Sequence, residues 1–219
     1  MFFHAITDSP LGPILLRSDG PHLSGLYFVG QKDCPNLPGL APMRPAHFDP
    51  SAGSLRGQPI RSLRVQPAGA GDLLPAGLGP AVGRSETAGD GLRILQDDTP
   101  DEAVAVLTQT ERQLSEYWQG RRQTFDIPLG FQGTPFQKTV WTALLGIDWG
   151  RTATYGELAR AAGLGAGHGR AVGAAVGRNP ISIIIPCHRV LAGGGVLNGY
   201  SGGLERKLRL LQLEGFVAR

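Results

Sequence analysis

A long Gly/Pro-rich stretch limits which parts of this 219-residue chain can build a folded core. From residue 35 to residue 91, 19 of 57 residues are glycine or proline, and the others show no sustained period of 2 or 3.6. Such a segment loses more chain entropy on folding than its few apolar side chains can offset. We therefore predict a mostly disordered insertion over residues 35–97, with ordered structure before and after it.

The residues around the insertion are predicted to form a small sheet and a helix. Short apolar runs alternate with Gly/Pro turn signals near the start of the chain, which is typical of antiparallel strands. The strands are expected at residues 2–6, 14–16 and 23–29. Thr99, Pro100 and Glu102 form a capping pattern, so a helix should begin there and continue to about Trp118. These elements make up an expected N-terminal domain, residues 1–132.

The remaining block, residues 133–219, is predicted to be mostly helical. Thr134 and Pro135 repeat the capping pattern and open a helix that should end at Gly146. Two short helices, roughly 154–162 and 168–177, follow it and are joined by a Gly-rich turn. Two short helices with a tight turn are a helix-turn-helix candidate.

The second of these helices is built almost entirely from small residues. Arg170 is its one long side chain, and the glycines inside it cost helix stability relative to alanine. Close approach of another surface would explain them. Either a neighbouring helix or a DNA groove satisfies that condition.

The last helix is predicted from an apolar stripe at Leu204, Leu208 and Leu211, with Ser201 as its cap and Lys207 facing outward. Glu214 lies at its C-terminal end, where a carboxylate opposes the helix dipole. The Glu214 side chain is therefore either solvated or held by a partner.

Charge is divided unevenly between the two blocks. Residues 1–132 carry 11 Lys and Arg against 14 Asp and Glu, a net charge of −3, whereas residues 133–219 carry 10 against 4, a net charge of +6. A basic block suits a polyanionic partner such as DNA, because neutralising phosphates releases counterions. Charge alone is equally compatible with an ordinary solvated surface.

Cys187 follows three β-branched residues, Ile183–Ile185, and Pro186. The β-branched run predicts a short buried strand that Pro186 ends. A thiol at a strand end with His188 beside it is placed for nucleophilic attack, because an imidazole can take the thiol proton. A buried structural cysteine is the alternative interpretation of this pair taken alone.

Residues 186–190, together with 177–180 before them and 198–204 after them, resemble the active-site block of the O6-alkylguanine-DNA alkyltransferases. The resemblance runs almost without gaps from Gly133 to Gly215. It implies an α+β fold: a small ribonuclease-H-like sheet-and-helix domain over residues 1–132, and a winged-helix-like helix-turn-helix domain over residues 133–219.

The function implied by the resemblance is DNA repair without a cofactor. The alkyl group of O6-methylguanine, and also of O4-methylthymine, would move to the sulfur of Cys187 in a reaction that each molecule performs once. The implied partner is double-stranded DNA containing alkylated guanine.

The resemblance implies roles in the alkyl transfer for five residues. Cys187 would be the acceptor, and His188 would act on it through a bridging water while Glu214 orients the imidazole. Asn179 would hold the helix-turn-helix against the site. Tyr155 would donate a proton to guanine N3 as the base leaves.

Five more residues receive roles in DNA or base binding. Arg170 would fill the stack after the nucleotide has flipped out, and Gly173 would allow close approach to the minor groove. Tyr200 and Ser201 would wall the base pocket, with backbone groups of Val190 and Ser201 reading the guanine edge.

Two departures from the family pattern concern the turn and the N-terminal domain. The spacing from Tyr155 to Arg170 is one residue longer than expected, which puts the geometry of the helix-turn-helix turn in question. Some relatives bind a structural zinc through N-terminal Cys and His, but Cys34 is the only cysteine besides Cys187, so no metal is predicted.

The surroundings of the protein are predicted from what the sequence lacks. It has no apolar run long enough for a membrane span and no export signal, so we expect a cytoplasmic monomer, associated with the nucleoid when bound to DNA, with both thiols free. Three other functions stay open: a non-enzymatic lesion sensor, a Cys-His hydrolase unrelated to DNA, and a role in transcription.

Overall fold

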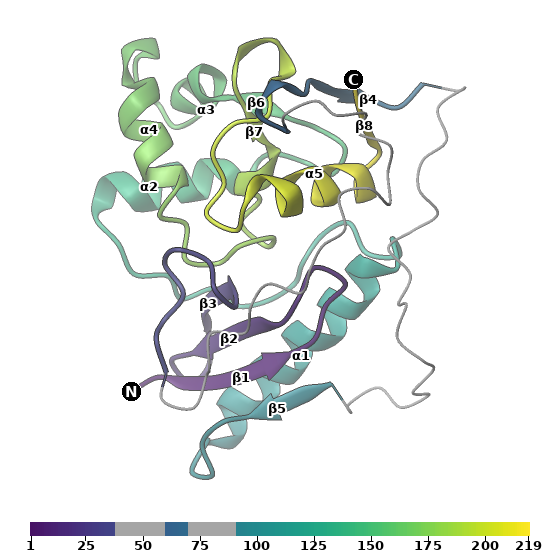
Figure 1. Cartoon of the computed structure of the whole chain (residues 1–219). Coiled ribbons are helices and arrows are strands. Elements are labelled where there is room, and N and C mark those ends of the chain that lie inside the picture. Colours follow the sequence, from purple (N-terminus) through teal and green to yellow (C-terminus); the bar gives the residue numbers. More distant parts are fainter. Residues whose placement is uncertain (38–59, 70–90) are drawn as a thin grey trace.

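A computed structural model describes residues 1–37, 60–69 and 91–219 of the chain (Figure 1). Its N-terminal part is an antiparallel sheet whose strand order is β3-β2-β1-β5, covered by helix α1. The elements are β1 (Phe3–Thr7), β2 (Ile14–Ser18), β3 (Leu23–Phe28), β5 (Leu92–Ile94) and α1 (Asp101–Trp118). The three strands predicted before the insertion are confirmed.

Within residues 35–97, predicted to be mostly disordered or a long irregular loop, the structure describes a few short regular elements. Residues 60–69 contain a 3-10 turn, η2 (Ile60–Ser62), and a strand, β4 (Val65–Pro67), and residues 92–94 supply the edge strand β5. The two strands are short but each pairs with a strand elsewhere in the chain, so their order comes from tertiary contacts that local composition does not reveal. The prediction for residues 38–59 and 70–90 lies outside the described residues.

The C-terminal part contains four of the five α-helices in the described residues, joined by several short elements. Its α-helices are α2 (Pro135–Leu145), α3 (Tyr155–Ala161), α4 (Gly169–Val176) and α5 (Leu204–Leu213). Its short elements are β6 (Ala153–Thr154), η3 (Ala166–His168), η4 (Cys187–Arg189), β7 (Val190–Leu191), η5 (Gly193–Gly195) and β8 (Phe216–Ala218). β6 pairs with β7 in parallel, and β8 pairs with β4.

Side-chain caps define some helix starts and not others. The Thr134–Gln137 capping box opens α2 as predicted. At α1 the expected box is absent, because the Thr99 hydroxyl donates to the carbonyl of Gln96 and Pro100 is the N-cap. Ser201 does not cap α5 either, since Gly203 occupies that position with a φ of 95°.

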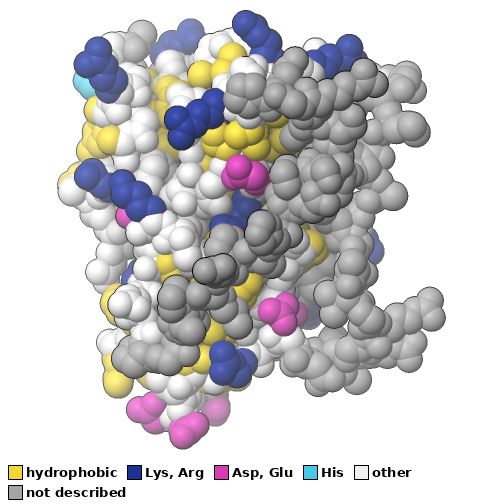
Figure 2. All heavy atoms as spheres, in the orientation of Figure 1, with side chains coloured by type: hydrophobic (Ala, Val, Ile, Leu, Met, Phe, Trp, Pro, Cys, Tyr) yellow, Lys and Arg dark blue, Asp and Glu magenta, His cyan; other side chains and the backbone are white. Residues whose placement is uncertain are grey.

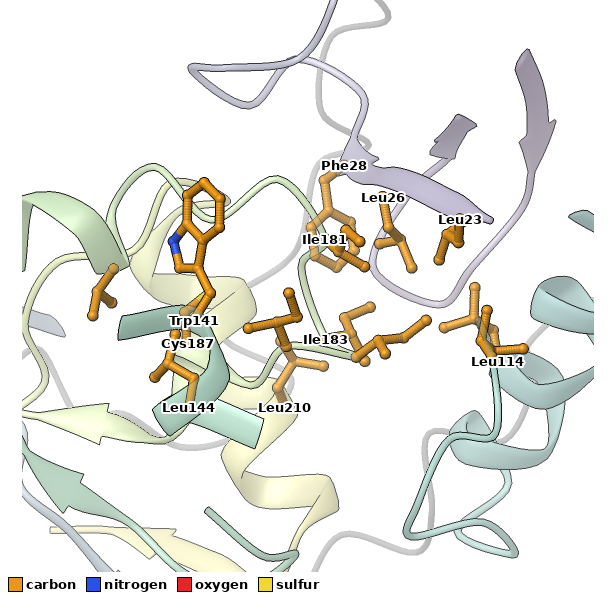
Figure 3. Close-up of a cluster of buried hydrophobic side chains, with 14 of the residues drawn as sticks. Leu23, Leu26, Phe28, Leu114, Trp141, Leu144, Ile181, Ile183, Cys187 and Leu210 are labelled. Atoms are coloured by element: carbon orange, nitrogen blue, oxygen red, sulfur yellow. The ribbon is translucent and has the colours of Figure 1, made fainter. Parts of the chain in front are cut away.

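The two parts share one hydrophobic core (Figure 3). Leu26 and Phe28 of β3 face Ile181 and Ile183, which lie on the chain leading to Cys187. The backbone continues this contact, because the Leu26 N–H donates to Pro180 O at 2.9 Å and the Ser182 N–H donates to Leu26 O at 2.9 Å. The N-terminal sheet therefore supports the segment that leads to Cys187.

The structure is thus mixed α and β, in agreement with the predicted class, with an antiparallel sheet and five α-helices in the described residues. None of the helices in those ranges has the length and apolar character needed to cross a membrane.

Candidate active site

The segment before Cys187 is a pair of tight turns. The expected strand at Ile183–Ile185 is wrong, since Ile183 has a φ of +71° and the Ile184 N–H donates to Ser182 O at 2.8 Å. An i to i+2 hydrogen bond around a positive φ is a γ-turn, a strained conformation for a β-branched residue. A second i to i+2 bond, from the Cys187 N–H to Ile185 O at 2.8 Å, spans Pro186.

Asn179 holds these turns in place. Its side-chain amide donates to Ile185 O at 2.7 Å and to Cys187 Sγ at 3.1 Å, while its Oδ1 accepts from the Ile181 N–H at 3.0 Å. Asn179 is buried and lies just after α4, so a single side chain links the end of this helix to the thiol.

Cys187 begins η4 and is only 2% exposed. Burial raises the pKa of its thiol above the usual value, whereas the Asn179 hydrogen bond and the Lys207 charge oppose that rise. At rest the sulfur therefore favours the thiol form, and attack requires that a base take its proton.

The His188 imidazole is neutral and has a nitrogen that can accept a proton. Its Nε2 lies 2.8 Å from Glu214 Oε1, and burial lowers the pKa of the imidazole despite the opposing effect of that carboxylate. A neutral ring that donates from Nε2 has its lone pair on Nδ1. Nδ1 is buried and has no hydrogen-bond partner in the described part of the chain.

Glu214 is held by several donors although it lies at a helix end. Arg189 donates to both carboxylate oxygens at 2.8 and 2.9 Å, and the Tyr117 hydroxyl donates to Oε1 at 2.8 Å. Burial raises the pKa of Glu214, but the neighbouring His188 and Arg189 outweigh it and lower the pKa to about 2. Of the two alternatives left open by the sequence, the carboxylate held by partners is the correct one.

The prediction that Lys207 faces outward is wrong, because its side chain is buried. Its ammonium is fully buried and donates to the carbonyls of Val190, Asn198 and Gly199 at 2.5, 2.6 and 3.2 Å. Burial lowers the Lys207 pKa to about 8, and the Cys187 sulfur has the opposite effect. A buried positive charge near the thiol favours the thiolate.

Two tyrosines lie near the thiol, and Ser201 follows the second of them in the chain. Burial raises the pKa of Tyr155 and, to a greater degree, that of Tyr200, and the charge of Cys187 raises both further. Each phenol is therefore protonated at neutral pH and can donate a hydrogen bond. The Ser201 hydroxyl is buried and has no partner within residues 1–37, 60–69 and 91–219.

The predicted helix-turn-helix corresponds to α3, η3 and α4. Arg170 is exposed on α4, whereas Gly173 faces the Tyr155 ring, which a Cβ at Gly173 would meet at 3.6 Å. That distance is ordinary van der Waals contact, so Gly173 is not required by packing inside the protein. Figure 2 shows Lys and Arg side chains over the upper, helical part of the molecule and a group of acidic side chains at its lower end.

No group of three or more His, Cys, Asp or Glu side chains within the described ranges is arranged to hold a metal ion. A cavity of about 420 Å³ lies along α2 and α3, and its lining contains none of the predicted site residues. The chemistry that the arrangement permits is therefore centred on the thiol: a buried Cys187 with a hydrogen-bond donor, a neutral imidazole and a buried cation around it.

Residues 135–216 match the family model described as 6-O-methylguanine DNA methyltransferase, DNA binding domain. A methylated-DNA–protein-cysteine methyltransferase of Methanosarcina acetivorans is 50% identical over 107 residues, which are 49% of this chain and 68% of that protein. The chain belongs to the methylated-DNA–protein-cysteine methyltransferase family.

Solved methyltransferase structures extend the similarity to the N-terminal part. The crystal structure of Mycobacterium tuberculosis OGT in complex with DNA matches with a TM-score of 0.61 and 31% identity, over 96% of this chain and 91% of that one. Among relatives compared by sequence alone, the methyltransferase of Mycobacterium bovis is 52% identical over 102 residues, which are 47% of this chain and 61% of that protein.

Three residues of the candidate site, Lys207, Arg189 and Tyr117, were not identified from the sequence. The signal for Arg189 was its position beside Cys187 and His188, with a buried carboxylate that needed a counter-ion. Lys207 could have been found by noting that the stripe at Leu204, Leu208 and Leu211 places residue 207 next to it on the helix. Tyr117 carries no such signal, because 97 residues separate it from Glu214.

Proposed function

We propose that this protein repairs DNA by moving the alkyl group of O6-alkylguanine onto Cys187. The observation that carries the proposal is the buried Cys187 thiol, which Asn179 contacts directly, next to the His188–Glu214 pair. Family membership supports the reaction class, and the DNA-bound mycobacterial structure supports DNA as the partner.

The transfer is a displacement at the alkyl carbon. The thiol proton goes to Nδ1 of His188, directly or through a water, and Sγ then attacks the carbon as the carbon–O6 bond breaks. The electron pair of that bond remains on guanine, which takes a proton from the Tyr155 phenol. The His188 imidazolium then returns a proton to the Tyr155 phenolate through solvent, so the net products are unmodified guanine and an S-alkyl cysteine.

The nearby charges favour this sequence of steps. Glu214 stabilises the imidazolium formed at His188, and the Arg189 ion pair keeps Glu214 ionised. The ammonium of Lys207 and the amide of Asn179 stabilise the thiolate. Water does not readily cleave a thioether, so each molecule reacts once.

The burial of Cys187 supports nucleotide flipping as part of the proposal. A sulfur that is 2% exposed cannot reach a base that remains stacked in a duplex. The exposed Arg170 on α4 would fill the space that the flipped nucleotide leaves in the base stack. Tyr200 and Ser201, with the backbone of Val190, would line the pocket that receives the base. The same site would accept O4-methylthymine, a smaller base with a similarly placed alkyl group.

Intact mass measurement tests the proposal. The protein is incubated with excess duplex containing O6-methylguanine, and the modified peptide is mapped. One methyl group on Cys187, saturating at one per molecule, is expected for the wild type and for Cys34→Ala, and none for Cys187→Ala. Tight lesion binding without any gain in mass would instead identify a non-enzymatic lesion sensor.

A further inference from the structure

Residues 60–69, called the strap below, belong to the N-terminal half of the sequence but pack on the C-terminal domain. Its strand β4 pairs with β8 near the end of the chain, away from β1, β2 and β3 (Figure 1). This pairing was not predicted, because the strap lies inside the Gly/Pro-rich stretch.

The strap is the central strand of a three-part backbone ladder. On one side, Leu63 O accepts from the Leu197 N–H at 3.0 Å. On the other side, Arg64 and Arg219 exchange two hydrogen bonds of 3.0 and 2.8 Å, and the Ala68 N–H donates to Gly215 O at 2.8 Å. The strap therefore joins the loop 193–199 to the tail 215–219 through its backbone.

Proline at position 67 is compatible with this ladder. Hydrogen-bonded and non-hydrogen-bonded pairs alternate along an antiparallel ladder, and the Arg64–Arg219 pair is hydrogen-bonded. By that alternation the Pro67–Phe216 pair is non-hydrogen-bonded, so the absent N–H of proline leaves no acceptor unpaired.

The side chains of the strap fill a separate apolar cluster on α5. Leu63 and Val65 are 3% and 6% exposed, and they pack with Leu208 and Leu211 of α5. Leu208 is the residue after Lys207, so the strap lies against the helix that carries the buried ammonium.

Both segments joined by the strap lead directly into the acceptor site. The loop continues to Asn198 and Gly199, whose carbonyls accept hydrogen bonds from Lys207. The tail begins one residue after Glu214, the carboxylate that holds His188. Movement of either segment would displace the charges around Cys187.

We propose that the strap is a positioning element of the alkyl-acceptor site: by tying the loop 193–199 to the tail 215–219, it holds Lys207 and Glu214 in the arrangement that activates Cys187. This inference rests on the proposed function. The strap touches neither the thiol nor the base, and it acts through the two segments that it joins.

Gly195 gives a way to disturb the strap without altering any of its residues. A Cβ at Gly195 would lie 2.7 Å from Val65 O, and the Gly195 φ is +77°. Gly195→Ala should therefore push β4 away from the loop. Gly193→Ala is a control in the same loop with no atom within 4 Å, and Gly120→Ala, at a φ of +69° in open space, controls for backbone strain alone.

Three measurements are made on each full-length variant at a temperature where it is folded. They are the rate of Cys187 methylation by duplex containing O6-methylguanine, the pH profile of Cys187 alkylation by iodoacetamide followed by peptide mapping, and amide exchange at Leu197 and Arg219. For Gly195→Ala we expect at least tenfold slower methylation, a shifted pH profile and faster exchange at both amides. Both control variants should behave like the wild type.

Val65→Ala serves as a second, milder variant if Gly195→Ala does not fold. Its matched control is Val65→Ile, which keeps a β-branched apolar side chain and should behave like the wild type. A wild-type methylation rate together with a wild-type pH profile in the folded variant overturns the proposal, whatever the amide exchange, because the strap would then be only structural. Failure of the wild type to be methylated would instead contradict the proposed function, and the iodoacetamide profile would still test the strap.

Discussion

The side-chain amide of Asn179 contacts the sulfur of Cys187 at 3.1 Å while it also donates to the carbonyl of Ile185 at 2.7 Å. The same residue accepts from the Ile181 N–H. Asn179 therefore fixes the shape of the turn and stabilises the nucleophile that the turn presents, and its position directly after α4 couples both to the proposed DNA-binding helix.

Asn179→Ala should lower both stability and reactivity. The buried Ile181 N–H would lose its partner, which costs about 1–3 kcal/mol, and the Ile185 carbonyl would keep only its hydrogen bond from the Cys187 N–H. The thiolate would lose a hydrogen-bond donor, so methylation of Cys187 should slow at least tenfold. Urea unfolding and the intact-mass assay measure the two effects, with the exposed Asn36→Ala as control. Wild-type methylation by Asn179→Ala would contradict the assigned role.

Glu214→Gln should remove a pH dependence of stability. The folded pKa of Glu214 is about 2, below its usual 4.5, so the ionised form stabilises the fold above pH 4.5 and that stabilisation is lost as pH falls toward 2. The contribution is on the order of 3 kcal/mol, and at neutral pH the variant also leaves the buried Arg189 unpaired.

Urea unfolding at pH 7 and pH 3.5 measures this difference. The wild type should lose more stability on acidification than Glu214→Gln does. Glu205→Gln, at an exposed residue on α5, should retain the wild-type slope. Equal acid slopes for the wild type and Glu214→Gln would show that the buried ion pair does not contribute as described.

Local sequence signals predicted the elements that depend on local chemistry. Thr134 caps α2 because its hydroxyl and the Gln137 side chain are in the sequence itself. The helix-turn-helix, α3 to α4, follows from a Gly-rich turn between two short helical patterns. The grouping of Cys187 with His188 and Glu214 followed from resemblance to a family and not from spacing, since 26 residues separate His188 from Glu214.

Tertiary contacts explain the predictions that were wrong. Three β-branched residues favour a strand, but Asn179 and the neighbouring edge of β3 hold Ile183 in a γ-turn. Lys207 was placed on the outer face because a lysine is rarely buried. Its burial depends on the three carbonyls that surround it and on the strap against the same helix, and neither is visible in the sequence of α5.

Lys207→Met should slow alkyl transfer and change the stability at alkaline pH. The folded pKa of about 8 lies below the usual 10.5, so the unfolded chain binds more protons between these values and stability rises with pH in that window. The variant should lose this rise. Its Cys187 should react more slowly below pH 8, because the positive charge that favours the thiolate is gone.

Unfolding at pH 8 and pH 10 and the methylation rate at pH 7 measure these effects, with Lys138→Met, at an exposed residue of α2, as control. An unchanged methylation rate in folded Lys207→Met would mean that the ammonium serves only to satisfy its three carbonyl partners.

Arg170→Ala should slow the flipping of the nucleotide without slowing the transfer of the alkyl group. Arg170 is exposed on α4 and lies outside the hydrogen-bonded group around Cys187, so its loss should leave the reactivity of the thiol intact. Transfer from duplex O6-methylguanine should slow at least tenfold, because only the duplex requires a nucleotide to leave the stack. Transfer from free O6-benzylguanine should stay within about twofold of the wild type, a difference of under 1 kcal/mol in barrier. Arg112→Ala, which removes an exposed charge from α1, should change neither rate. Equal losses on the two substrates would place the effect of Arg170 in the acceptor site itself and remove the support for a role in flipping.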